Sequence, residues 1–352
     1  MNVIAGIQQI GIGVSDVYAA QKWYKDNLGY NIAIFDEAAE ANLMLPYTDG
    51  KPQSRHAILA YNMRGGGGFE IWQYTSRTPS LPKFEIQLGD LGIFATKIKS
   101  TNIKKAHNTF ETNGVNIISE IEKTPNGKQH FFIKDPYNNI FEIEENNEYL
   151  LPLNKTTGGA SGVIIGVKDI EVSKKFYSKI LGYDTIIYER ESVFNDLKGL
   201  PGSKSNCKRT LLSHSKARVG AFSPLLGSSQ IELIQVLDRE PINIFKDRLW
   251  GDLGYIHLCY DVLNMSVIKK ECETLGHLFT VDSANSFDMG EAAGHFTYVE
   301  APEGTLIEFV ETHKIPIIKK IGWFLNLKKR GQTKALPKWF FKLLASTQKF
   351  KS

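Results

Sequence analysis

Short runs in which apolar residues alternate with small or polar ones recur along the chain, and they predict many β-strands separated by a few helices. The first run covers residues 7–14 and is followed by Asp16, a residue typical of a helix N-cap. Apolar residues follow at helical spacing in residues 19–24, and Gly29 stands where a C-cap glycine would. Three further strand-like runs end near residues 69–72. This quarter of the chain is therefore predicted to be β-α-β-β-β.

The same order is predicted four times, because segments of the first half recur in the second half. The matching segments are 10–17 with 163–170, 23–30 with 176–183, 70–92 with 232–254, and 135–142 with 301–308. The offset grows from 153 to 162 between the second and third pairs. The second half thus holds about nine extra residues, which we expect in the loop at 199–215, rich in Gly, Ser and Lys.

The repeat predicts an α+β protein made of four βαβββ modules. Modules 1 and 2 are expected to form a first domain at residues 1–149, and modules 3 and 4 a second domain at 161–313. Residues 150–160 are interpreted as a linker, and residues 314–352 as a basic helical tail.

Composition and charge exclude several classes of protein. A hydrophobic content of 42% and a charged content of 23% suit a globular chain with a full core. The three cysteines provide neither a disulfide framework nor a CxxC metal motif, and neither a secretory signal nor a long apolar span is apparent. We therefore expect a cytoplasmic protein.

The net charge of +4 is unevenly distributed. The tail carries 11 Lys or Arg and no Asp or Glu, so the remaining residues carry 31 basic and 38 acidic side chains. A mildly acidic body with a basic tail does not indicate a nucleic-acid-binding surface.

Ionisable residues stand inside several apolar strand-like runs. Glu232, His257 and Glu308 are the clearest cases, and Glu70 and Glu142 occupy matching positions in the first half. A buried charge is costly unless it is paired or bound to a metal. The alternatives at this point are a metal site, salt bridges to Arg or Lys, or exposure on a sheet edge.

The motifs that carry these residues resemble a known superfamily. The opening strand Gln9-Ile10-Gly11-Ile12-Gly13-Val14, the helix end at residues 23–30 and the Asp135-Pro136 ending are similar to those of vicinal oxygen chelate proteins. That group includes glyoxalase I, methylmalonyl-CoA epimerase, extradiol dioxygenases and the fosfomycin and bleomycin resistance proteins. The resemblance implies that pairs of modules form U-shaped cradles around a divalent metal, with modules 1+2 and 3+4 as the expected pairs.

The resemblance also implies the ligand positions, one in the first strand and one in the last strand of each module. The second cradle would then hold a metal through Glu232, His257 and Glu308. One imidazole and two carboxylates suit Fe, Mn, Ni, Co or Zn. Either Glu308 or Glu232 would be the catalytic base.

The first cradle is expected to be weaker or free of metal. It would offer Gln9, Glu70 and Glu142, while Ile93 stands where a histidine ligand would be. Gly162 leaves the corresponding slot of the second cradle empty.

The leading functional hypothesis is a metal-dependent lyase or isomerase of the glyoxalase I or methylmalonyl-CoA epimerase type, acting on a small molecule. An Fe(II)-dependent extradiol dioxygenase is an alternative, because Tyr298 lies ten residues before Glu308, a spacing that resembles those enzymes. A third possibility is a small-molecule binding or resistance protein without catalysis.

The tail allows two interpretations. In residues 315–350, aromatic residues such as Trp323, Phe324, Trp339 and Phe340 alternate with lysines. This pattern is typical of a peripheral membrane segment on anionic lipid. It is equally typical of a segment whose aromatic rings pack on the protein while its lysines remain in water.

Overall fold

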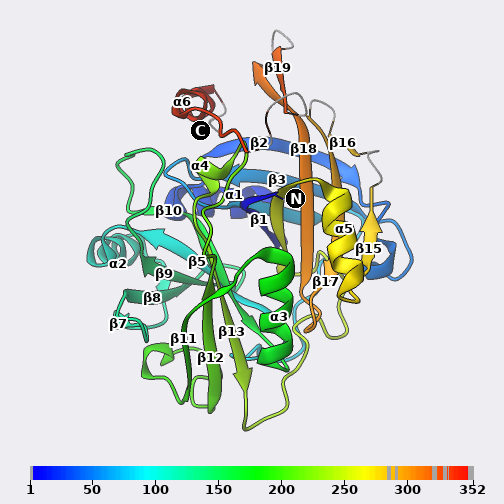
Figure 1. Ribbon diagram of the computed structural model, residues 1–352. Coiled ribbons are helices and arrows are strands. Elements are labelled where there is room, and N and C mark those ends of the chain that lie inside the picture. The colour runs from blue at the N-terminus through cyan, green and yellow to red at the C-terminus, as the bar shows by residue number, and fades with distance from the viewer. Residues whose placement is uncertain are drawn as a thin grey trace.

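The computed structural model describes residues 3–283, 287–289, 292–318, 323–327, 331 and 333–347. Two large curled sheets with helices against them make up this part of the chain, as Figure 1 shows. The predicted α+β class with βαβββ modules is confirmed.

The first sheet has ten strands and combines module 1 with module 4. Its strand order is β15-β17-β18-β14-β1-β4-β3-β2, with β16 and β19 beside β17 and β18. Module 1 contains β1 (Val3–Gly13), α1 (Val17–Trp23), a π-helical turn (Tyr24–Leu28), β2 (Ile32–Glu40), a 3-10 turn (Leu45–Tyr47), β3 (Ser54–Tyr61) and β4 (Gly68–Tyr74). Module 4 contains β14 (Gly254–Leu263), α5 (Met265–Thr274), β15 (Phe279–Asp282), β16 (Phe287–Met289), β17 (Ala292–Glu300) and β18 (Leu306–Ile318).

The second sheet has nine strands and combines module 2 with module 3. Its strand order is β11-β12-β13-β10-β5-β9-β8-β6, with β7 beside β8. Module 2 contains β5 (Gly92–Ser100), α2 (Ile103–Thr112), β6 (Asn116–Ile117), β7 (Glu122–Lys123), β8 (Gln129–Lys134) and β9 (Ile140–Glu145). Module 3 contains β10 (Thr157–Gly166), α3 (Ile170–Leu181), β11 (Thr185–Ser192), a 3-10 turn (Asn195–Leu197), β12 (Cys207–Ser213), α4 (Ser223–Leu226) and β13 (Gln230–Val236).

The expected pairing of modules 1+2 and 3+4 is therefore wrong. Strand β1 pairs antiparallel with β14, and β10 pairs antiparallel with β5, so module 1 joins module 4 and module 2 joins module 3. Each cradle draws one module from each half of the chain. Residues 1–149 and 161–313 are repeat units, but neither of them builds a cradle by itself.

One hydrophobic core connects both sheets with helices α1, α2, α3 and α5. The repeated helix-end tyrosine has a structural role in this core. The Tyr24 hydroxyl donates a 2.6 Å hydrogen bond to Asp135 of module 2, and the Tyr177 hydroxyl donates an equivalent bond to Glu303 of module 4. The repeated motif thus fixes the contact between consecutive modules.

The extra residues of the second half lie elsewhere than expected. The connection between β12 and β13 spans residues 214–229, whereas the equivalent connection in module 1 spans only residues 62–67. This insertion carries α4, which packs against β1 of the other sheet. The peptide N–H of Gly66 donates to the carbonyl of Leu225, and a Cβ on Gly66 would meet backbone atoms of Gly159 at 2.5 Å. Close approach of the two sheets here requires glycine.

The tail is only partly helical. Its first part extends β18 to Ile318 and pairs with β19 (Trp323–Asn326), and helix α6 (Lys338–Thr347) follows. Phe340 is buried, as one interpretation predicted, whereas Trp339 is 59% exposed. Membrane contact through this segment stays a prediction, and the side chain of Trp323 lies outside the described residues.

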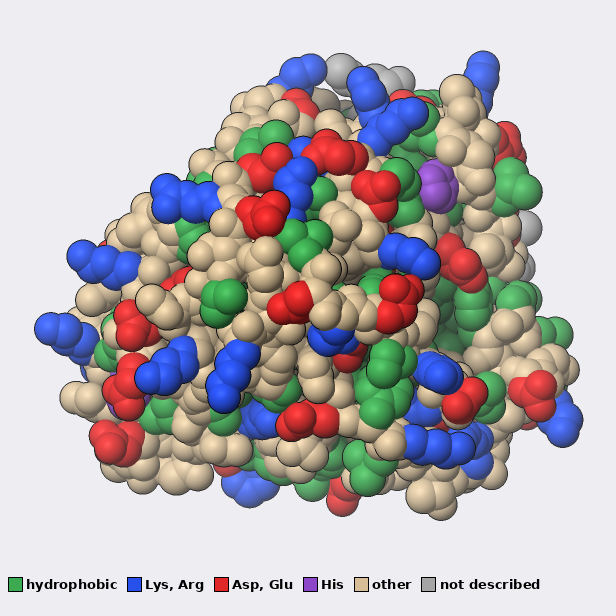
Figure 2. Space-filling view, turned by 90° about the horizontal axis from the view of Figure 1, so that it is seen from below, with side chains coloured by type: hydrophobic (Ala, Val, Ile, Leu, Met, Phe, Trp, Pro, Cys, Tyr) green, Lys and Arg blue, Asp and Glu red, His purple; other side chains and the backbone are tan. Residues whose placement is uncertain are grey.

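Two surface features complete the fold. On the face seen in Figure 2, acidic and basic side chains are interspersed rather than grouped by sign. Among the described helices, none is both long and apolar enough to cross a bilayer.

Candidate metal centre

Four side chains with metal-ligating atoms meet on the concave face of the first sheet. Gln9, Glu70, His257 and Glu308 come from β1, β4, β14 and β18, which are neighbours in that sheet. The His257 Nε2 atom lies 3.2 Å from Glu70 Oε2 and 3.3 Å from Glu308 Oε2. The Gln9 amide donates a 3.2 Å hydrogen bond to Glu70. One candidate ligand atom from each of Glu70, His257 and Glu308 lies within 4.8 Å of the others.

Glycine at position 11 makes room for the imidazole. Gly11 lies between His257 and Glu70 in the sheet, paired with His257 on one side and Glu70 on the other. A Cβ at this position would lie 2.4 Å from His257 Cε1. The small-residue face of the opening strand is therefore the floor under the histidine ring.

Aromatic rings hold that histidine in place. Trp250 stacks on the His257 ring at 6.1 Å between centroids, and Tyr298 meets it edge-on at 5.7 Å. Trp72 contacts Trp250 in turn. The imidazole is oriented by packing, and its entire side chain is shielded from solvent.

The unpartnered polar atoms of the cluster fit a cation. Gln9 Oε1, His257 Nε2 and Glu308 Oε2 are buried without a hydrogen-bond partner in the described part of the chain. Such atoms are rare in native structures and call for an explanation such as an ion. Two carboxylates, an imidazole and an amide oxygen form a donor set that suits Fe, Mn, Ni, Co or Zn.

The pKa values of the cluster are coupled through the imidazole. Burial raises the pKa of Glu308 to about 7, an effect that His257 opposes and the Glu70 carboxylate reinforces. Burial also acts to raise the pKa of Glu70, but contacts with His257 outweigh it and the net shift is downward. The two carboxylates therefore differ, since Glu308 is the one that holds a proton more readily.

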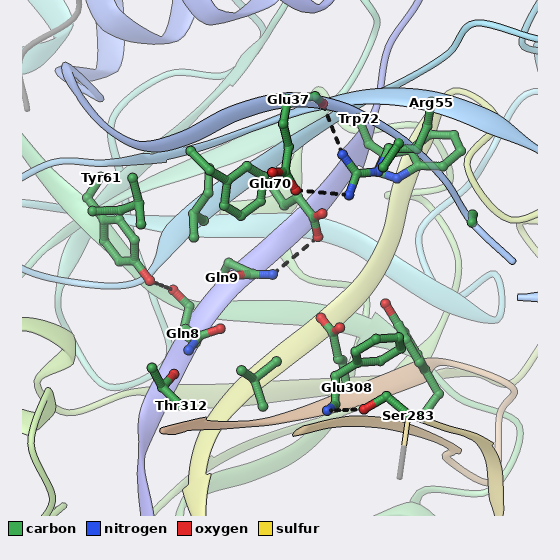
Figure 3. Close-up of a pocket in the computed structure, with 18 of the residues that line it drawn as sticks. Gln8, Gln9, Glu37, Arg55, Tyr61, Glu70, Trp72, Ser283, Glu308 and Thr312 are labelled. Atoms are coloured by element: carbon green, nitrogen blue, oxygen red, sulfur yellow. Dashed lines mark hydrogen bonds and ion pairs between the residues drawn. The ribbon is translucent and has the colours of Figure 1, made fainter. Parts of the chain in front are cut away.

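A cavity of about 480 Å³ opens from this cluster. Figure 3 shows Gln9, Glu70 and Glu308 along its wall together with Trp72 and Tyr61. Tyr298 also lines it, directly opposite Glu308 in the register of β17 and β18. This size is typical of small-molecule sites.

The second cradle holds a lysine between the two carboxylates of its last-strand positions, Glu142 and Glu232. Lys97 Nζ pairs with Glu142, lies 2.6 Å from Glu232 and lies 3.9 Å from Glu144. All these side chains are at most 4% exposed. The carboxylates raise the pKa of Lys97 against the opposing effect of burial, so the ammonium stays charged.

Further charges complete this second cluster. Arg209 pairs with Glu232 and with Asp196, and the Glu142 carboxylate accepts a 2.7 Å hydrogen bond from His130 Nδ1. The Tyr188 hydroxyl donates to Glu232 at 2.8 Å. With the carboxylates neutralised in this way, the residues do not fit a metal ion.

The structure thus changes the predicted ligand sets. Glu232 does not join His257 and Glu308, because it lies in the other sheet beside Lys97 and Arg209. Likewise Glu142 does not join Gln9 and Glu70. Each of these residues lies at the strand position that was predicted for it. The wrong pairing of modules, however, assigned Gln9 and Glu70 to one cradle and His257 and Glu308 to the other.

Two important residues were not predicted from the sequence. Lys97 neutralises the carboxylates of the second cradle, and Trp250 stacks on the His257 ring. Lys97 stands four residues after Ile93 in an apolar strand run, and strand alternation puts both on one face. A lysine in the strand that pairs with the Glu142 strand was the available signal for a salt-bridge cluster.

Comparison with known proteins agrees with this architecture. Residues 6–143 match the model of the glyoxalase/bleomycin resistance protein/dioxygenase superfamily. Glyoxalase I from Zea mays is a similar solved structure, with a TM-score of 0.54 and 13% identity over 88% of this chain and 92% of that chain. A putative dioxygenase from Bacillus subtilis subsp. subtilis str. 168 has a TM-score of 0.53 and 12% identity over 88% and 86%.

At these identities the solved structures show a shared fold alone. No curated protein matches the sequence. Residues 6–143 thus belong to the glyoxalase/bleomycin resistance protein/dioxygenase superfamily, and the fold shared with the solved structures extends over 88% of the chain.

Proposed function

We propose that the protein is a divalent-metal-dependent lyase or isomerase of the glyoxalase I or methylmalonyl-CoA epimerase type. Its substrate would be a small molecule with two adjacent oxygens. The observation that carries this proposal is the convergence of Gln9, Glu70 and Glu308 at the wall of one cavity, with the buried His257 ring within 3.3 Å of both carboxylates.

These four residues would hold Fe, Mn, Ni, Co or Zn. When bound, the metal would stabilise negative charge that develops on the two adjacent substrate oxygens. Glu308 would move the proton, because its carboxyl borders the cavity in which the substrate would lie. Glu70 would remain a ligand, held in place by the Gln9 amide and beside the His257 ring. Trp72, Trp250 and Tyr298 would exclude water around the reacting atoms.

Glu232 is not proposed as the base. Glu232 lies in β13 of the second sheet, and its buried carboxylate forms ion pairs with Lys97 and Arg209. A carboxylate held by two cations has a low proton affinity and a poor capacity to abstract a proton. Proton transfer is therefore assigned to Glu308 alone.

The extradiol-type dioxygenase remains a second candidate because of Tyr298. This side chain is buried beside both His257 and Glu308, where its hydroxyl could bond to a bound substrate. The first-strand ligand position holds Gln9 rather than histidine, and a carboxamide is a weaker ligand for iron. This favours the lyase or isomerase hypothesis over ring cleavage.

Metal analysis tests the proposal most directly. Purified protein is stripped, incubated separately with Fe(II), Mn(II), Ni(II), Co(II) or Zn(II), desalted and analysed. We expect one metal ion per chain for wild type and for the control His107→Ala, a histidine on α2. We expect His257→Ala and Glu308→Ala to lose it. If wild type binds none of the five metals stoichiometrically, both enzyme hypotheses are overturned. The hypothesis of a non-catalytic small-molecule binding protein would then stand.

A second assay separates the two enzyme classes. Oxygen uptake by the Fe(II)-loaded protein is followed with catechol and substituted catechols. Oxygen consumption that disappears in Tyr298→Phe would favour the dioxygenase. Metal-loaded protein that consumes no oxygen would support the lyase or isomerase.

A further inference from the structure

The cavity beside the candidate metal centre extends well beyond the space that a two-oxygen head group needs. Its lining includes Gln9 and Glu308 at one end and also Leu226 and Leu344, which belong to the apolar cluster around α4 and α6. The site therefore has a chelating end and an apolar end.

The apolar end is made by two segments outside the repeated design. Leu225 and Leu226 come from the insertion that carries α4, and Phe340 and Leu344 come from the C-terminal helix α6. They pack in one cluster with residues of β1 and β3. Figure 1 shows α4 and α6 lying close together beside the first sheet. These added segments give the cavity an apolar extension.

Charge in the cavity excludes an anionic tail on the substrate. Among the described lining residues the acidic ones are Glu37, Glu40, Glu70 and Glu308, and Arg55 is the single basic one. The Arg55 guanidinium donates a 3.0 Å hydrogen bond to the Glu37 carbonyl and pairs with its carboxylate at 3.5 Å. Among the described residues that line the cavity, no unpaired cationic side chain is left to bind a carboxylate or phosphate.

From this geometry we propose that the substrate carries an uncharged apolar chain or ring next to its two adjacent oxygens. Phe340 and Leu344 would then be specificity-determining residues. This inference rests on the proposed function for the head group, whereas the apolar chain depends only on the cavity. A polyanionic conjugate, such as a charged peptide thiol adduct, would be rejected.

Four probes separate the head group from the chain. Acetohydroxamate has two adjacent oxygens without a long chain, octanohydroxamate has both, and octanamide has the chain without the chelating pair. Suberic acid monohydroxamate carries the same length of chain ending in a carboxylate. Binding to the full chain loaded with Mn²⁺ is measured by calorimetry.

We expect octanohydroxamate to bind at least about 30-fold more tightly than acetohydroxamate, because buried CH₂ groups each contribute favourably. The terminal carboxylate of the suberic probe should remove most of this gain. Leu344→Trp, which fills the apolar end, should reduce the ratio to a few-fold. The control Trp339→Ala, an exposed position on the same helix, should leave the ratio unchanged.

Each failure has its own signature. Equal affinity for the two hydroxamates, or for the carboxylate-ended probe and octanohydroxamate, would overturn the apolar substrate. Octanamide that binds as tightly as octanohydroxamate would support the apolar cavity and refute the metal head-group site. Octanamide, octanohydroxamate and acetohydroxamate that all fail to bind would overturn both.

Discussion

Replacement of Lys97 by methionine is expected to destabilise the whole fold. Its ammonium lies between Glu142 and Glu232 at the centre of the second sheet, and all three side chains are at most 2% exposed. Methionine retains most of the volume of lysine and removes only the charge. The variant therefore tests the electrostatic role of this side chain rather than its packing.

The expected loss follows from the charges that remain. Without Lys97, Glu142 keeps His130 as its one side-chain partner among the described residues, and Glu232 keeps Arg209 and Tyr188. Breaking a buried ion pair by removing one partner typically costs about 3–5 kcal/mol. The net stability of a domain is only about 5–15 kcal/mol, so Lys97→Met should be strongly destabilised or unfolded.

Urea denaturation at pH 7 followed by tryptophan fluorescence measures this loss. We expect the midpoint of Lys97→Met to fall by about 1 M or more relative to wild type. Lys22→Met, which removes a lysine that is 75% exposed and paired with Asp26, should change stability by less than about 0.5 kcal/mol. The double variant Lys97→Met/Glu232→Gln should recover part of the loss. If the urea midpoint of Lys97→Met equals that of wild type, the Lys97 ammonium is not needed to neutralise the carboxylates of the second cradle.

Three further predictions concern the first sheet. Gly11→Ala should weaken Mn²⁺ binding at least tenfold, because its Cβ would displace the His257 ring. The control Gly331→Ala should leave the affinity unchanged. Unchanged affinity in Gly11→Ala would contradict the close packing of His257 on Gly11. Burial raises the pKa of Asp261 to about 8, so the folded state keeps a proton that the unfolded state has released between about pH 4 and pH 8. Stability should therefore fall as pH rises through this window, and Asp261→Asn should be the more stable protein at pH 8 by as much as ~5 kcal/mol; thermal melts that show equal differences at pH 5 and pH 8 would refute this. Tyr298→Phe should keep its metal and bind acetohydroxamate about tenfold more weakly, through loss of one buried hydrogen bond; an unchanged Kd would remove Tyr298 from the site.

The sequence was sufficient to predict the elements and the ligand slots, because these depend on local patterns. Alternation in the opening strand placed Gln9, Gly11 and Gly13 on one face, and the structure puts Gln9 on the cavity wall and Gly11 under His257. The motif at residues 135–142 marked the last strand of module 2 in the same way. Such positions follow from strand period and turn chemistry within a single module.

The pairing of modules could not be predicted from the same patterns. Strands β1 and β10 are both rich in glycine and branched apolar residues. Each could pair with β5 or β14 and bury the same face. The register of Gly11 against His257 is set by backbone hydrogen bonds, which carry little side-chain information. One signal was available, because only the pairing of module 1 with module 4 collects Gln9, Glu70, His257 and Glu308 in one cradle.

The two cradles begin from the same electrostatic problem and solve it differently. In each, two glutamates from the last strands of paired modules face a buried concave surface, and neither pair is stable there without a positive charge. In the second cradle Lys97 and Arg209 supply that charge from the chain itself. In the first cradle the described residues offer the neutral amide of Gln9 and the imidazole of His257, whose pKa Glu308 and Glu70 raise against the opposing effect of burial. We therefore infer that one cradle is neutralised by cations of its own chain, whereas the candidate metal centre and the apolar cavity lined by α4 and α6 belong to the other cradle.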